Sequence, residues 1–394
     1  MPAADEANLV AVPARGARAV DAITRAWDRG DAVAPLDPGA PGAAVAARLA
    51  VLRPTHVDDG DGTRPVPDRG EPVPAGVGAV LATSGTTGTP RAVQLDHDAL
   101  SASARAVHMA IGREPDDRWL CCVPVHHVAG LAIVARARTH DLPLVVHEAF
   151  DVDAVGASPE HEGATLVSVV ATMLTRLLDA GAPVDHFRVA LLGGGPIPRE
   201  LVARATARGA HVATTYGMTE TGGGCVHDGH ALPGVDVRIA PDGEIQVRGP
   251  VVMRGYHRDP DATRDAFTTD GWLRTGDVGE RADDGTLRVV DRRRDLVITG
   301  GVNVSPTSVE RVLARHPRVA DVCVTGAPDA EWGERVVAHV VPADANGLPT
   351  LDELRAFARD ELSAAELPRE LRLAASIPRT ASGKPRRGLL RSRA

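Results

Sequence analysis

Short apolar runs alternate with helix-like stretches between about residues 76 and 216, and this alternation limits the possible fold more than any other feature of the chain. The runs of strand length are 76–83, 119–125, 142–148, 165–171 and 187–193, and the helix-like stretches are 98–111, 128–139, 172–180 and 198–208. Such alternation indicates strands that are largely buried between helices. The sequence therefore predicts an α/β protein with a large N-terminal α/β domain.

The pattern changes after residue 232. Pro241-Asp242-Gly243 and Asp284-Gly285 each separate two alternating runs, as hairpin turns do. We therefore predict a β-rich part over about 232–291. Beyond 295 helical and strand patterns alternate again, which predicts a small α+β domain. The predicted domains are residues 1–291 and 292–394.

Composition excludes several classes of protein. The chain has 394 residues, 43% hydrophobic and 24% charged, which is typical of a globular protein. No apolar run reaches membrane-spanning length, and a net charge of −8 disfavours a general nucleic-acid binder. The start of the sequence has no secretory signal pattern, and the four cysteines lack metal-binding spacing, so we expect a cytoplasmic protein with reduced thiols.

The N-terminal part gives weaker signals. Residues 20–29 and 42–52 are candidate short helices, and the Asp- and Gly-rich stretch 58–74 predicts an exposed loop. No chemistry is evident in this part.

A loop rich in Thr and Gly follows the apolar run 76–83. Glycines let backbone N–H groups turn towards an anion, hydroxyls add donors, and Arg91 adds a positive charge. The predicted phosphate-binding residues are Thr83, Ser84, Gly85, Thr86, Thr87, Gly88, Thr89 and Arg91. The spacing differs from that of Walker A, and a flexible loop is the alternative.

Two later segments carry further candidate ligands. In 214–224, Tyr216 offers a flat surface to a base, while Thr219 and Glu220 suit a phosphate oxygen and Mg²⁺. In 271–280, Asp277 follows a glycine and can accept hydrogen bonds from ribose. In isolation, Glu220 could equally be a surface charge and Asp277 a turn residue.

Lysine occurs once. Lys and Arg together number 44, and Lys384 is the single lysine among them. It follows Ser-Gly in a basic, loop-like segment that has no acidic residue. A chain that uses arginine almost everywhere can keep one lysine where arginine does not work, which makes Lys384 a candidate functional residue; a chance leftover of codon usage is the alternative.

Together these segments resemble the adenylate-forming superfamily of acyl-CoA synthetases, adenylation domains and luciferases. The resemblance rests on the loop 84–90, on YGMTE at 216–220, on TGD at 275–277, on the basic run at 292–294 and on Lys384, all in the family's order. It implies a mobile C-terminal domain with a hinge at Arg294.

The resemblance also implies roles for individual residues. Lys384, Glu220 and Thr219 would be catalytic, Glu220 would hold Mg²⁺, and Gly300 and Gly301 would meet coenzyme A. The residues implied to bind ATP, besides the phosphate loop, are Gly194, Tyr216, Gly217, Asp277 and Arg292. The residues implied to border the acid are His127, Gly193, Gly195, Thr221 and Gly222.

The segments CVPVHHVAGL, LLGGGPIP and YGMTETGGGCVHDG narrow the resemblance to the compact o-succinylbenzoate–CoA ligases of menaquinone biosynthesis, in particular those of actinobacteria. We expect ATP, Mg²⁺, coenzyme A and a small carboxylic acid as ligands. A homodimer is left open. Other short-chain or aryl acid–CoA ligases, a carrier-loading adenylation enzyme and a non-catalytic nucleotide-binding protein are the alternatives.

Three positions depart from the family's pattern. Arg91 stands where lysine is usual, Asp291 where a glycine usually precedes the nucleotide-contacting arginine, and Arg294 where Asp or Lys is common at the hinge. The last two bear on domain rotation rather than on the reaction.

Overall fold

The computed structural model describes residues 5–66, 70–83, 91–344, 347–379 and 383–391. The chain divides into two compact units. Unit 1 comprises Met1–Val237 and Val247–Arg274, and unit 2 comprises Arg238–Gln246 and Thr275–Ala394. The predicted domains 1–291 and 292–394 are divided at an expected hinge, not by contacts within the fold. This division stays a prediction.

Unit 1 contains two seven-stranded sheets. The first has the order β18-β8-β7-β3-β2-β4-β5. Its strands are β2 (Leu9–Val12), β3 (Ala32–Pro35), β4 (His56–Asp58), β5 (Thr63–Pro65), β7 (Val77–Thr83), β8 (Arg91–Asp96) and β18 (Gly255–Tyr256). A separate pair joins β1 (Glu6–Ala7) to β6 (Val73–Pro74).

The second sheet has the order β10-β9-β11-β12-β13-β14-β15, and its pairs from β10 to β13 are parallel. Its strands are β9 (Trp119–Cys121), β10 (Leu144–Val146), β11 (Leu166–Val170), β12 (Val189–Gly193), β13 (Val212–Met218), β14 (Gly223–His227) and β15 (His230–Ala231). Strands predicted at 119–125, 142–148, 165–171 and 187–193 are therefore confirmed.

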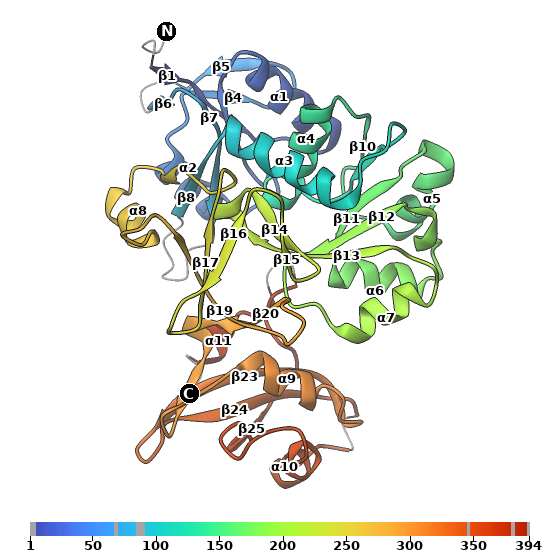
Figure 1. Cartoon of the computed structure of the whole chain (residues 1–394), viewed down its shortest axis with the longest axis vertical. Helices are drawn as coiled ribbons and strands as arrows, with labels where there is room; N and C mark the ends of the chain where they lie inside the picture. The colour runs from blue at the N-terminus through green and yellow to red at the C-terminus, as the bar shows by residue number, and fades with distance from the viewer. Residues whose placement is uncertain (1–4, 67–69, 84–90, 345–346, 380–382, 392–394) are drawn as a thin grey trace. The chain divides into compact units, whose positions relative to one another are not determined.

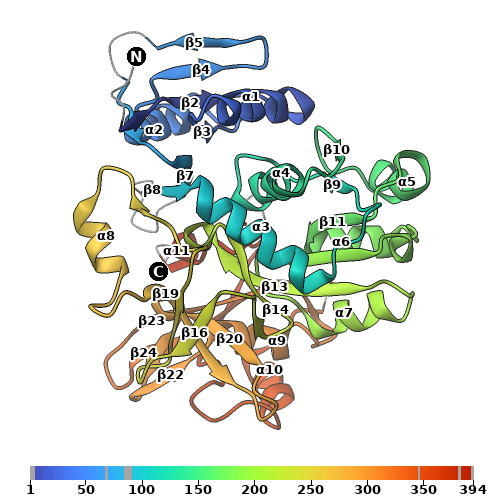
Figure 2. The same ribbon diagram turned by 45° about the horizontal axis from the view of Figure 1, so that its top comes forward.

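Helices cover both faces of this second sheet (Figure 1). The helices of unit 1 are α1 (Gly16–Asp28), α2 (Gly42–Leu52), α3 (His97–Ile111), α4 (Val128–His140), α5 (Val152–Glu162), α6 (Ala171–Asp179), α7 (Arg199–Thr206) and α8 (Pro260–Ala266), with 3-10 turns η1 (Val184–His186) and η2 (Thr219–Thr221). Figure 2 shows α3 and α4 between the two sheets, while α6 and α7 pack on the opposite face of the second sheet. None of the described helices is long and apolar enough to cross a membrane.

A buried ion pair holds the amino ends of three parallel strands together. Asp117, just before β9, is 1% exposed and accepts hydrogen bonds from Arg188 at 2.8 and 2.6 Å. Thr165, just before β11, donates to the same carboxylate at 3.1 Å. Burial alone would raise the pKa of Asp117, but these donors lower it below its ordinary value. The opposite, carboxyl ends of the strands are the usual place for ligands in such sheets.

Unit 2 is built on a five-stranded sheet in which β22-β21-β24-β23 are neighbours and β25 pairs with β24. Its elements are η3 (Arg293–Asp295), β21 (Val297–Thr299), β22 (Val302–Val304), α9 (Pro306–Leu313), β23 (Val319–Asp329), β24 (Gly333–Pro342), α10 (Leu351–Ala358), β25 (Glu370–Leu373) and α11 (Arg387–Arg391). Apolar side chains of α9 and α10, including Val309, Leu313 and Leu354, form its core with β23 and β24. This confirms the predicted α+β character.

A four-stranded sheet accounts for the β-rich pattern after residue 232. Its order is β16-β17-β19-β20, with strands β16 (Asp236–Ile239), β17 (Glu244–Arg248), β19 (Leu273–Arg281) and β20 (Leu287–Arg292). The chain passes between the units within β16, β17 and β19, so this sheet contains residues of both.

The stretch 58–74 is more ordered than the sequence predicts. Asp58 ends β4 and is completely buried, because Arg25 of α1 and Thr63 of β5 donate hydrogen bonds to its carboxylate. The expected exposed loop is thus wrong for its first part. The candidate helices at 20–29 and 42–52 are confirmed by α1 and α2.

We predict that Arg188→Leu destabilises the protein by about 3–5 kcal/mol, because it leaves the Asp117 carboxylate buried and unpaired. The matched control is Arg204→Leu, which breaks an exposed pair with Asp179 and should change stability by less than about 1 kcal/mol. Urea unfolding at pH 7 measures both. Similar effects of the two substitutions would contradict the role given to Asp117.

Candidate active site

The ends of the predicted phosphate loop are joined by a strand pair. Thr83 ends β7, Arg91 begins β8, and the two residues are opposite each other in the antiparallel register. The Thr83 hydroxyl also donates to the Arg91 carbonyl at 3.2 Å. Ser84, Gly85, Thr86, Thr87, Gly88 and Thr89 lie outside the described residues.

Glu220 has a partner that sequence reasoning missed. The Tyr256 hydroxyl donates to Glu220 Oε1 at 2.9 Å, and the Arg91 guanidinium lies 5.2 Å from the centre of the Tyr256 ring. Burial and the neighbouring Glu220 carboxylate raise the pKa of Tyr256, so the phenol stays protonated and donates. Tyr256 thus connects the end of the phosphate loop to the predicted metal ligand.

Guanidinium groups gather beside this tyrosine. A cavity of about 380 Å³ is lined by Arg53, Arg91, Arg258 and Tyr256, among others. Glu71 forms ion pairs with Arg53 and Arg258. The excess of positive charge at this end of β8 suits a polyphosphate.

The segment that carries Tyr216 and Glu220 forms a tight bend at the carboxyl end of β13. β13 pairs with β14, and the register shifts between Tyr216 and Gly217. A Cβ at Gly217 would lie 1.8 Å from the Gly223 carbonyl oxygen, so only glycine fits there. The backbone N–H of Met253 donates to the Glu220 carbonyl at 2.8 Å and holds the bend.

The predicted place of Thr221 beside the acid stays a prediction, but its hydroxyl is engaged inside the turn. Thr221 is fully buried, its hydroxyl oxygen lies 2.7 Å from the Gly223 carbonyl, and it accepts from the Met218 N–H at 3.0 Å. It therefore shapes the turn instead of offering a donor to a ligand. Gly222, in the left-handed region with φ of 62°, is also buried.

The other predicted acid-site residues lie at carboxyl ends of parallel strands. Gly193 ends β12 and is buried against Thr215, whereas Gly194 and Gly195 are exposed. His127 is exposed, and its carbonyl accepts from the N–H groups of Gly130 and Leu131 at the start of α4.

His126 is half-buried beside His127, with 4.5 Å between the ring centres. Desolvation and the neighbouring His127 lower the pKa of His126 to about 4, so His126 is neutral at pH 7.

Unit 2 brings the predicted ribose ligands and the single lysine together. Asp277 and Arg292 are opposite each other on β19 and β20, and Arg292 Nε lies 2.7 Å from Asp277 Oδ1. Although much of Lys384 is exposed, desolvation and the charge of Arg292 lower the pKa of its ammonium group, against the opposing effect of Asp277; Arg294 lowers it further. A lysine, an aspartate and arginines distant in sequence thus share one cluster.

Gly300 and Gly301 form the turn between β21 and β22. Both have positive φ, 57° and 80°, and a Cβ at Gly300 would lie 2.8 Å from the Trp332 ring. No neighbour lies within 4 Å of a Cβ built at Gly301. The turn therefore requires glycine at the first position and leaves room for a ligand at the second.

Comparison with known proteins assigns the family. The profile described as AMP-binding enzyme matches residues 44–257, and that of the AMP-binding enzyme C-terminal domain matches residues 308–384. The chain belongs to the AMP-binding enzyme family. The predicted adenylate-forming resemblance and the α/β fold class are therefore confirmed.

Relatives in this family support the narrower resemblance. The 2-succinylbenzoate–CoA ligase of Listeria monocytogenes is 36% identical over 80% of this chain and 70% of its own length. The probable 2-succinylbenzoate–CoA ligase of Mycobacterium tuberculosis is 39% identical, over 82% of this chain and 85% of its own. The solved o-succinylbenzoate CoA synthetase of Bacillus subtilis, in complex with its acyl-adenylate, has a TM-score of 0.87 at 28% identity and covers 98% of this chain and 88% of its own.

The family implies a magnesium ion, and the described carboxylates suit it only if the protein and the phosphates of ATP hold the ion together. Within the described ranges, no three His, Cys, Asp or Glu side chains form a metal-binding group. Mg²⁺ commonly takes one or two carboxylates together with substrate phosphates and water. Glu220, oriented by Tyr256, suits this arrangement.

We predict that Tyr256→Phe weakens magnesium-dependent ATP binding about tenfold, because Glu220 loses a hydrogen bond to its charged group. The ring that faces Arg91 is retained. Calorimetric titration with and without Mg²⁺ measures the effect, and with EDTA the two proteins should bind ATP alike. An equal loss with and without metal would show that Tyr256 does not act through Glu220.

Proposed function

We propose that this enzyme ligates o-succinylbenzoate to coenzyme A in menaquinone biosynthesis, with ATP converted to AMP and pyrophosphate. The observation that carries the proposal is the cluster of Lys384, Asp277 and Arg292, found in an AMP-binding enzyme whose relatives are named 2-succinylbenzoate–CoA ligases. The reaction class is that of an AMP-forming CoA ligase.

In the first half-reaction, a carboxylate oxygen of the acid attacks the α-phosphorus of ATP, and pyrophosphate leaves. Negative charge then gathers between the acid and the phosphate. Lys384 supplies a compact cation for this charge, and its pKa is lowered first by desolvation and then by the nearby charge of Arg292. Asp277 and Arg292 would hold the ribose, and Tyr216 would pack on adenine.

Phosphates are held by unit 1. Thr83, Arg91 and the loop between them would bind the β- and γ-phosphates, with Gly194, Gly217 and Thr219 close to the nucleotide. When bound, Mg²⁺ neutralises phosphate charge and makes pyrophosphate a better leaving group. Glu220 would be its protein ligand, and the Tyr256 hydroxyl fixes the direction of that carboxylate.

In the second half-reaction, the coenzyme A thiolate attacks the acyl carbonyl carbon, and AMP leaves. Gly300 and Gly301 would lie against the pantetheine arm, because the turn between β21 and β22 is open at its second glycine. Rotation at Arg294 in η3 would move Lys384 away from the reacting groups and bring the turn between β21 and β22 to them.

Small residues favour an aromatic acid. The proposed acid site lies near His127, Gly193, Gly195 and Gly222, at the carboxyl ends of the parallel strands. Gly193 and Gly222 are buried, so the exposed Gly195 is the glycine here that leaves room for a flat ring. With Thr221 engaged in the turn, backbone N–H groups or water are the donors left for the spare carboxylate of o-succinylbenzoate.

A substrate panel tests the choice of acid. Acid-dependent pyrophosphate release should give the highest kcat/KM with o-succinylbenzoate among this acid, benzoate and a medium-chain fatty acid. If another acid is preferred, the menaquinone assignment fails and the ligase assignment survives. If no acid supports pyrophosphate release, the ligase assignment fails as well.

We predict that Lys384→Arg lowers the rate of adenylation by about 10²-fold or more, the typical effect of removing one donor to developing charge. Thioester formation from preformed acyl-adenylate should change much less, because Lys384 has no part in that step. Rapid-quench measurement of each half-reaction checks this. Equal losses in both halves would contradict the assigned role.

We also propose a cytoplasmic location and a homodimer. All four cysteines are buried free thiols, which fits a reducing compartment. Sedimentation of the purified protein tests the oligomeric state.

A further inference from the structure

The segment that carries Lys384 is attached to unit 2 on both sides of the lysine. Before it, Arg379 donates to Asp321 of β23 at 2.6 Å and to the Gly383 carbonyl at 2.8 Å. After it, the Arg386 N–H donates to the Pro378 carbonyl at 2.8 Å. The described residues on the two sides of Lys384 are therefore fixed to each other.

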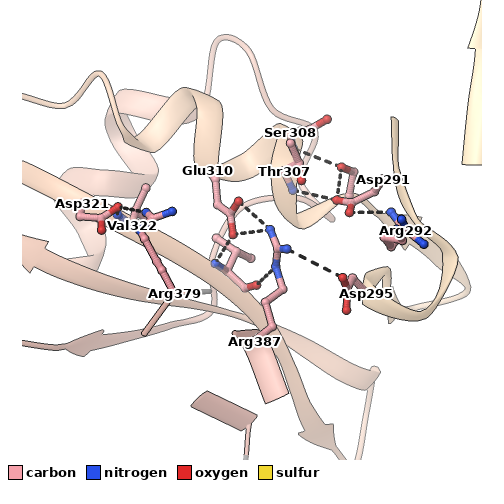
Figure 3. Close-up of polar contacts among 12 residues, drawn as sticks. Asp291, Arg292, Asp295, Thr307, Ser308, Glu310, Asp321, Val322, Arg379 and Arg387 are labelled. Atoms are coloured by element: carbon pink, nitrogen blue, oxygen red, sulfur yellow. Dashed lines mark hydrogen bonds and ion pairs between the residues drawn. The ribbon is translucent and has the colours of Figure 1, made fainter. Parts of the chain in front are cut away.

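Arg387, three residues after Lys384, connects this segment to three other elements (Figure 3). Its Nη2 donates to both oxygens of Glu310 on α9, at 2.8 and 2.7 Å. Its Nε donates to the Val324 carbonyl on β23 at 3.2 Å, and its Nη1 lies 3.8 Å from Asp295 Oδ2. Only 11% of its side chain is exposed, so these contacts are shielded from water.

Glu310 is fixed in turn by the backbone. The N–H of Val324 donates to Glu310 Oε1 at 2.7 Å. Burial raises the pKa of Glu310, an effect that the charge of Arg387 opposes. The positive charge of Arg387 thus helps the buried Glu310 carboxylate to stay ionised.

The contact to Asp295 relates Arg387 to the charges around Lys384. Asp295 ends η3, which also contains Arg294, and Arg292 directly precedes η3. Arg292 and Arg294 are two of the groups whose charge acts on Lys384, and Asp277 is the third. Arg391 adds a second link, because its guanidinium donates to the Asp295 carbonyl at 3.3 Å. Arg387 therefore connects the residues that follow Lys384 to η3, the turn that contains Arg294.

We infer that Arg387 is a positioning residue for adenylation: by binding Glu310, Val324 and Asp295 together, it sets where residues 383–387 present the ammonium group of Lys384. This inference rests on the proposed function for the role of Lys384. Lysine in place of Arg387 keeps the charge but lacks the planar group that reaches three elements at once.

The single lysine gives the inference a readout that is separate from catalysis. An amine-directed acylating reagent can modify only Lys384 and the amino terminus, and peptide mass spectrometry distinguishes the two. The pH dependence of the labelling rate reports the pKa of Lys384 in the full-length protein. A substitution that lowers stability but leaves the protein folded under the labelling conditions, as circular dichroism checks, does not shift this value.

We predict two effects of Arg387→Met. The apparent pKa of Lys384 rises towards the ordinary value of about 10.4, because the ammonium group regains water and is no longer held beside Arg292 and Arg294. The rate of adenylation falls about tenfold, while thioester formation from preformed acyl-adenylate stays within about twofold. Arg387→Lys should recover part of the loss.

Two further variants complete the test. Arg318→Met removes an exposed arginine of unit 2 that binds Glu353 at 3.0 Å, and it should leave labelling and both half-reactions unchanged. Glu310→Gln keeps the shape of Arg387's partner and should give a milder form of the Arg387→Met effects; it also serves if Arg387→Met does not fold.

An unchanged pKa of Lys384, or equal losses in the two half-reactions, would overturn the inference and leave Arg387 a structural residue. Failure of the proposed function has a different signature, since the wild type would then release no pyrophosphate with any acid. The labelling experiment still decides in that case whether Arg387 positions Lys384.

Discussion

Parallel pairing of β9, β11, β12 and β13 is the constraint on which unit 1 depends. Parallel strands end on the same edge of a sheet, so the chain leaves each of them at one common edge. His127, Gly193 and Tyr216 come to that edge for this reason, although they are far apart in sequence. The Asp117–Arg188 pair joins the strands at the other edge.

Most of the fold could be predicted from the sequence, because strands buried on both faces leave uninterrupted apolar runs and helices leave periodic ones. Elements with weaker patterns were not predicted. Helix α5 contains Pro159, which interrupts a helical pattern, and β8 begins with Arg91, which directly follows a loop rich in Thr and Gly. The burial of Asp58 could not be predicted either. A run of Asp and Gly predicts exposure, and nothing in that run indicates that Arg25, far away in the sequence, binds the carboxylate.

Candidate site residues were predictable where the chemistry is local. Lys384 and Asp277 are indicated by their own segments and Arg292 by the family resemblance, and the charges of Asp277 and Arg292 both act on Lys384 in the structure. Tyr256 was not found, because its hydroxyl reaches Glu220 across the fold and nothing in its own segment indicates a ligand. The engagement of the Thr221 hydroxyl could not be predicted either: a threonine among glycines looks available in a sequence, and only the turn shows that its hydroxyl is already used.

Asp291 stands where the family usually has glycine, and its side chain makes hydrogen bonds that glycine cannot make. Its carboxylate is 7% exposed and accepts hydrogen bonds from the Ser305 hydroxyl at 2.8 Å and from the Thr307 N–H at 2.9 Å, at the start of α9 (Figure 3). Asp291 precedes Arg294 in the chain, whereas Ser305 and Thr307 follow it. A turn of the backbone at Arg294 would therefore part this carboxylate from both donors and return it to water. A glycine could make no such bonds. Under the proposed rotation, aspartate would therefore hold one orientation more firmly than glycine could, and it would do so before any substrate binds.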